Sequence, residues 1–122
     1  MRHHGAVSEL AAEEEYRLEI ADLRRKVSRL KAEHGEAHLI EEFEAELRIL
    51  DALFQAATVT LAAVERDPML ADQLRQQGFP RADFREVYAF VYDAALELEL
   101  ADRPLAAVIR ATDFTAGLRA PA

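Results

Sequence analysis

The feature that most constrains the fold is a run of apolar residues with heptad spacing in the middle of the chain. Its members are Ile40, Phe43, Leu47, Leu50, Phe54, Ala57, Leu61 and Val64. They are alternately three and four positions apart without interruption, and only an α-helix brings such positions to one side. Further apolar residues flank this stripe and widen the apolar surface. We therefore expect a long central helix that other helices surround.

The composition agrees with an all-α fold. Ala, Leu, Glu and Arg are good helix formers and dominate the 122 residues, while the four glycines and four prolines fall between periodic runs. A chain of this length suits one domain. We predict a helical bundle of about five helices, three long and two short, with heptad seams like those of coiled coils.

Helix start and stop signals give the expected boundaries. Asp67 and Pro68 suit the cap and first position of a short helix that Gly78 would end. Asp83, with Glu86 three positions later, suits the start of another helix. We predict a single helical domain over 8–113. The predicted segments are a flexible N-terminus (1–7), a helical arm (8–34), a central helix (36–66), C-terminal helices (67–113) and a tail (114–122).

The arm carries a second heptad seam with a basic flank. The seam residues are Tyr16, Ile20, Leu23, Val27 and Leu30. Arg24, Lys26 and Lys31 flank this seam, whereas acidic residues flank the seam of the central helix, at Glu44, Glu46 and Asp51. Because the two flanks have opposite charge, we expect the arm to pack on the central helix, within one chain or across a dimer.

Two arrangements of these helices are possible, and they differ at Gly35. The first seam is out of step with the second by one residue, and glycine disfavours a helix interior by roughly 1 kcal/mol. The chain either reverses near Gly35 as an α-helical hairpin or continues as one very long helix. We favour the break.

The helix that begins near Asp83 is apolar on two sides, and this pattern points to a partner. Its second apolar face consists of Phe90, Tyr92, Leu96 and Leu100. In so small a chain, a second subunit can provide the burial that this face requires. We therefore predict a non-enzymatic protein–protein interaction module that forms a homodimer or higher homo-oligomer through this face and the arm seam. An adaptor, a small regulator, an assembly chaperone or a phage-type structural subunit would fit.

A basic run over 24–31 supports an alternative, a nucleic-acid-associated subunit. Its cations are Arg24, Arg25, Lys26, Arg29 and Lys31, which could contact phosphates. No aromatic residue interleaves with them to stack on bases, and the net charge of −8 disfavours general nucleic-acid binding. Nucleic acid is therefore the less favoured partner, and the acidic surface better suits another protein with a basic surface.

A second alternative is a metal-binding helical bundle. His34, His38 and Glu42 are each four positions apart, so they would share one face of a continuous helix and could bind zinc or iron. A break at Gly35 would separate them. We therefore expect no cofactor.

Catalysis and membrane insertion are not expected. The chain has no cysteine, and its two serines, Ser8 and Ser28, have no neighbouring histidine–acid pattern. Asp93 has apolar neighbours in the sequence, so its carboxyl group is either buried or lies on a narrow polar edge of its helix. The longest uncharged helical run, Ala52–Val64, is short for a bilayer, and no secretory signal pattern is visible, so we expect a cytoplasmic protein.

Overall fold

The computed structural model describes residues 3–98 and 104–119, with side chains described from Ala12 onward. Within these residues the protein is all α-helical and has no strand. Residues 3–98 and 104–119 form six helices where about five were predicted for the chain. They are α1 (His3–Ala32), α2 (Ala37–Arg66), α3 (Pro68–Gln76), α4 (Phe84–Glu97), α5 (Leu105–Ala111) and α6 (Ala116–Arg119).

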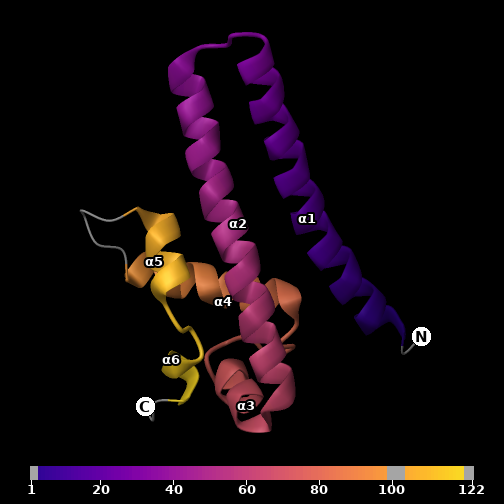
Figure 1. The fold of residues 1–122 in the computed structure, drawn as a ribbon. Coiled ribbons are helices and arrows are strands. Elements are labelled where there is room, and N and C mark those ends of the chain that lie inside the picture. The colour runs from indigo at the N-terminus through magenta and orange to yellow at the C-terminus, as the bar shows by residue number, and fades with distance from the viewer. Residues whose placement is uncertain (1–2, 99–103, 120–122) are drawn as a thin grey trace.

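The helices form a long hairpin with a small helical body around one half of it (Figure 1). α1 and α2 are antiparallel, and their joined ends extend as an arm beyond the other helices. α3, α4 and α5 pack against α2, and α4 also contacts α1. The corner where the arm meets α4 is the part of this architecture that matters most for the candidate site.

The hairpin reverses through a Schellman motif at the end of α1. The amide of Gly35 donates to the carbonyl of Leu30 (2.8 Å), and that of His34 donates to Lys31 (3.2 Å). His34 has the left-handed φ of 55° that this motif requires. The favoured break near Gly35 is therefore present, and the single long helix is not. α1 begins at His3, earlier than the start at residue 8 that the sequence suggested.

Gly35 is needed here because of space. A Cβ on Gly35 would lie 3.1 Å from Leu30 Cδ2 and 3.2 Å from the Leu30 carbonyl oxygen. α3 ends in the same motif with Gly78 in the left-handed position, at φ 103°, as the sequence predicted. The two turns therefore use glycine for different reasons.

The predicted N-caps of α3 and α4 are confirmed. The Asp67 carboxylate accepts from the Met69 amide at 3.0 Å, and the Asp83 carboxylate accepts from the Glu86 amide at 3.0 Å. Glu86 does not return the bond to its own cap residue as a capping box would. Its carboxylate instead accepts from the amides of Arg81 (2.6 Å) and Ala82 (2.8 Å) in the preceding turn.

The hydrophobic core surrounds the second half of α2. Small and medium side chains of α2 allow the shorter helices to approach closely, and the largest buried side chains come from α3 to α6. Those buried most completely are Leu70, Leu74, Phe84, Val87, Val91, Ile109 and Leu118. Phe114 is also buried, and Leu118 lies in α6. The segment predicted as a tail from residue 114 is therefore packed into the core through these two residues, because α6 covers α3.

An aromatic cluster fixes α1 and α4 to the middle of α2. Tyr16 stacks on Tyr88 with ring centroids 4.1 Å apart, and Phe84 contacts both Tyr16 (5.7 Å) and Phe54 (5.4 Å). Aromatic pairs at such distances add stabilisation beyond the apolar area that they bury. The cluster therefore sets the position of α4 at the base of the arm.

Candidate interaction surface

An apolar groove of about 560 Å³ lies between α2 and α4, at the base of the arm. It is lined by Glu42, Ala45, Glu46, Ile49, Leu50, Leu53, Tyr88 and Tyr92. The α2 residues follow helical spacing and form one stripe, and the two tyrosines of α4 form the opposite wall. The groove therefore offers an apolar floor with carboxylates at one end, which suits an apolar helix with basic residues.

Exposed apolar residues continue from the groove along α4. Tyr92 is 41% exposed, Leu96 43% and Leu98 48%. Tyr92 and Leu96 belong to the face predicted from the sequence, and both reach the surface as that prediction required. Leu98, the C-cap residue of α4, lies two positions beyond Leu96 and therefore on another side of the helix, so it is not part of this surface.

Two other members of the predicted face are placed differently. Phe90 is buried and contacts Phe79 edge-on at 5.9 Å, so it belongs to the core and cannot reach a partner. The reason is geometric, because Phe90 lies two positions from Tyr92 and therefore on another side of the helix. Leu100 lies outside the residues that the structure describes.

Tyr88, in the α4 wall of the groove, carries no charge at neutral pH. Burial raises the pKa of Tyr88 from its ordinary 10.0 to about 12, and the neighbouring Tyr16 adds to the effect. Burial likewise raises the pKa of Tyr16. The charge of the groove therefore comes from Glu42 and Glu46 at its other end, and the ion pairs among the described residues involve neither of them.

The arm seam is covered within a single chain. Ile20 and Val27 are buried, and Tyr16, Leu23 and Leu30 are half-buried. α1 and α2 contact each other along the hairpin. Of the two pairings left open by the sequence, the structure has the one within a chain, so these side chains are not displayed for a partner.

Ion pairs between α1 and α2 confirm the expected charge complementarity. Arg24 binds Asp51 at 3.0 Å, and Lys31 binds Glu44 at 2.7 Å. The ammonium of Lys26 lies 4.3 Å from the ring centroid of Phe43. These contacts set the register of the hairpin.

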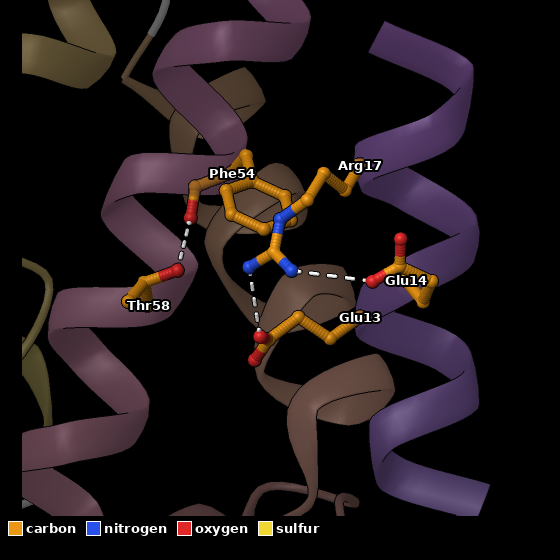
Figure 2. Close-up of polar contacts among 5 residues, drawn as sticks. All are labelled: Glu13, Glu14, Arg17, Phe54 and Thr58. Atoms are coloured by element: carbon orange, nitrogen blue, oxygen red, sulfur yellow. Dashed lines mark hydrogen bonds and ion pairs between the residues drawn. The ribbon is translucent and has the colours of Figure 1, made fainter. Parts of the chain in front are cut away.

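Arg17 forms a similar link nearer the body (Figure 2). Its guanidinium pairs with Glu13 (3.0 Å) and Glu14 (3.2 Å) while lying 5.4 Å from the ring centroid of Phe54. The neighbouring Thr58 hydroxyl donates to the Phe54 carbonyl at 2.9 Å. The Arg17 guanidinium therefore links α1 to α2 through the ring of Phe54, which also belongs to the aromatic cluster.

The basic run is largely engaged by the protein itself. Arg24 and Lys31 pair with α2, and Arg25 pairs with Asp22 on α1. Among the described residues, no ion pair involves Arg29. A phosphate-binding interpretation would therefore require several of these pairs to be replaced.

The predicted metal site is not assembled. His34 lies in the left-handed turn, whereas His38 and Glu42 follow in α2, so the shared face of a continuous helix does not exist. Over residues 3–98 and 104–119, no group of three histidine or acidic residues is placed to hold a metal ion. Asp93 is exposed, which leaves it on the polar edge of α4.

A second hollow, of about 640 Å³, lies between α2 and the segment that follows α5. Its lining includes the small residues Ala52 and Ala56, the exposed Val59 and the buried Thr60. This hollow was not predicted from the sequence. The small side chains spaced along α2 were the available signal, since they leave room beside a helix.

Comparison with protein-family models, with curated proteins and with solved structures gave no match. Among the described helices, α2 alone is long and apolar enough to cross a membrane by length and composition. This evidence is weak, because the core helix of a soluble protein has the same properties.

Proposed function

We propose that the chain is a non-enzymatic protein–protein interaction module that works as a homo-oligomer, most simply a dimer. An adaptor, a small regulator, an assembly chaperone or a phage-type structural subunit would use such a module. We expect it to act in the cytoplasm, without a cofactor. The observation that supports the proposal is the apolar groove between α2 and α4, with Tyr92 exposed in its wall and Leu96 exposed one turn further along α4.

The physical reason is the cost of leaving this surface in water. Burial of apolar surface is favourable by about 25 cal/mol per Å². Contiguous exposed apolar surface on a small protein commonly marks an interaction site. Tyrosine is frequent in such interfaces because its ring is apolar while its hydroxyl tolerates water. The groove combines these features at the junction of two elements that the aromatic cluster holds in place.

The test is the solution mass of a Tyr92→Ser/Leu96→Ser variant. Each side chain is less than half exposed, so its burial at an interface is worth about 1 kcal/mol, a third to a half of the value for full burial. A symmetric dimer buries this face of both copies, so the variant loses four side chains, about 4 kcal/mol, and self-association should weaken roughly a thousandfold. Sedimentation equilibrium over a concentration series measures this change directly.

The matched control is Met69→Ser on α3. Met69 is 65% exposed but does not line the groove, so its loss should leave the association constant unchanged. Equal weakening by both variants would indicate a general effect of surface polarity and would contradict the assignment of the interface. Unchanged association of the double variant would contradict it as well.

A further inference from the structure

We propose that the acidic end of the groove binds a basic, amphipathic segment of another protein. An apolar side chain of this partner lies on the groove floor, and its lysine or arginine side chains pair with the carboxylates of Glu42 and Glu46. The inference goes beyond the proposed function, because it concerns a different partner and the α2 side of the groove instead of the exposed face of α4. Three properties of this end of the groove support it: its charge, its apolar floor and its open side.

The carboxylates at this end of the groove have no cation paired with them. Glu42 and Glu46 line the groove from α2, both are exposed, and no ion pair within residues 12–98 and 104–119 involves either of them. A third acid lies nearby on α1. Burial is the main reason why the pKa of Tyr88 is raised, and the negative charge of Glu19 adds to it, so Glu19 lies close to the same groove wall.

Two cations of α1 that reach across to α2 are engaged elsewhere. Lys31 pairs with Glu44 at 2.7 Å, and the ammonium of Lys26 lies 4.3 Å from the ring centroid of Phe43. An approaching cation therefore meets glutamates whose charge no ion pair offsets in the described part of the chain. Carboxylates beside an apolar surface attract such a cation more strongly than carboxylates surrounded by water.

A second copy of this chain is a poor source of these cations. The chain has 23 acidic and 15 basic residues and a net charge of −8, so two copies repel each other electrostatically. More than half of the lysines and arginines already form ion pairs within the described residues. Self-association through the apolar side chains of Tyr92 and Leu96 does not need the groove carboxylates. The acidic end therefore suits a protein of opposite charge.

The groove floor sets the spacing that the partner needs. Ile49 is half-buried on α2, and Glu46 and Glu42 lie three and seven positions before it on the same side of the helix. At 1.5 Å per residue, the two glutamates lie about 5 and 10 Å from Ile49 along α2. A partner helix with cations three or four and seven positions from an apolar anchor has the same spacing.

The position of α4 decides the direction in which the partner segment runs. Tyr88 of α4 closes one end of the groove, so a segment anchored on Ile49 must end there. Toward the other end, the arm extends beyond α4 and the other helices of the body (Figure 1). The partner segment can therefore continue along α2 toward the tip of the arm, past Glu46 and Glu42.

Binding of a synthetic peptide tests the proposal. The probe is a fluorescein-labelled helical peptide of about 14 residues, or about four turns, with leucine on one face and lysine on the other. Fluorescence anisotropy at physiological ionic strength should show binding to the wild type. Glu42→Gln/Glu46→Gln should bind the peptide at least tenfold more weakly, because both charge pairs are lost. A peptide with serine in place of leucine should also bind at least tenfold more weakly, because it cannot use the apolar floor.

Glu41→Gln/Glu65→Gln is the matched control. It removes the same number of charges from exposed residues that do not line the groove, so it should bind the peptide like the wild type. Equal weakening by both variants would show a general attraction to an acidic protein and would overturn the proposal. Unchanged binding by the groove variant would overturn it as well. Circular dichroism confirms that each variant is folded, and Glu46→Gln replaces the groove variant if that variant is not.

The outcomes separate this proposal from the proposed function. A monomeric wild-type protein that binds the peptide through Glu42 and Glu46 would overturn self-association and leave the basic partner in place. An oligomeric wild type that does not bind the peptide would do the reverse. Sedimentation equilibrium of Glu42→Gln/Glu46→Gln covers the remaining case. If this variant lost self-association together with peptide binding, a second copy would be the occupant of the groove and the proposal would be wrong.

Discussion

Replacement of His34 by glycine should stabilise the protein. His34 is the residue in the left-handed position of the Schellman motif that ends α1, with φ 55°. A residue with a Cβ is strained in this region, whereas glycine adopts it freely. α3 uses Gly78 at the equivalent position, so the chain itself contains the preferred solution.

The expected gain follows from two opposing effects. Removal of the left-handed strain is worth about 1–2 kcal/mol. The greater freedom of glycine in the unfolded chain costs about 0.4–1 kcal/mol. The free energy of unfolding should therefore rise by about 0.5–1 kcal/mol in His34→Gly. Gly78→Ala makes the opposite kind of change at the end of α3, because it puts a Cβ on the residue in the left-handed position. No atom lies within 4 Å of this Cβ, so backbone strain is its main effect. We expect that strain to lower the free energy of unfolding by a similar or larger amount.

Urea unfolding followed by circular dichroism measures both changes. The midpoint should shift while the slope stays constant, and all variants should be compared at one protein concentration in case association contributes. His34→Ala is the control, since it keeps the Cβ and should resemble the wild type. If His34→Gly were no more stable than His34→Ala, the account of this turn would be wrong.

Three other variants test local features by the same unfolding assay. Gly35→Ala should destabilise the hairpin by about 1 kcal/mol, because its Cβ would crowd Leu30 at 3.1 Å; an unchanged midpoint would refute the close approach. Glu86→Ala should cost about 1–3 kcal/mol by leaving two amides without their acceptor, and Glu86→Gln, which keeps an oxygen there, should recover most of it. Tyr88 has a pKa raised from 10.0 to about 12, so its contribution to stability is complete below pH 10 and is lost as the pH rises to 12. Tyr88→Phe should therefore flatten the decline in stability over that window, and an unchanged decline would contradict this account.

Much of the architecture could be predicted from local signals. The heptad stripe identified α2, and Asp67, Asp83 and Gly78 marked helix ends correctly because capping depends on a few neighbouring residues. Opposite charges on the arm and the central helix predicted that these two helices pack together. The ion pair between Arg24 and Asp51 agrees with that prediction.

The remaining features depend on contacts between distant segments. From the sequence, Phe114 and Leu118 suggested at most a loosely docked tail, because no local signal indicates that α6 packs on α3 and that both side chains are buried in the core. Phe90 looked available for a partner until Phe79, eleven positions earlier, proved to cover it. The groove itself requires Tyr92 of α4 and Ile49 of α2 to face each other, which periodicity within either helix cannot indicate.

The central claim is that the apolar surface around Tyr92 mediates self-association, and the absolute mass of the wild-type protein tests it most directly. Light scattering across a concentration and salt series gives this mass without a shape assumption. The account predicts a dimer or larger oligomer that persists at high salt, because apolar burial is not screened as ion pairs are. A mass that stays near the monomer value of 13.7 kDa at every concentration would contradict it.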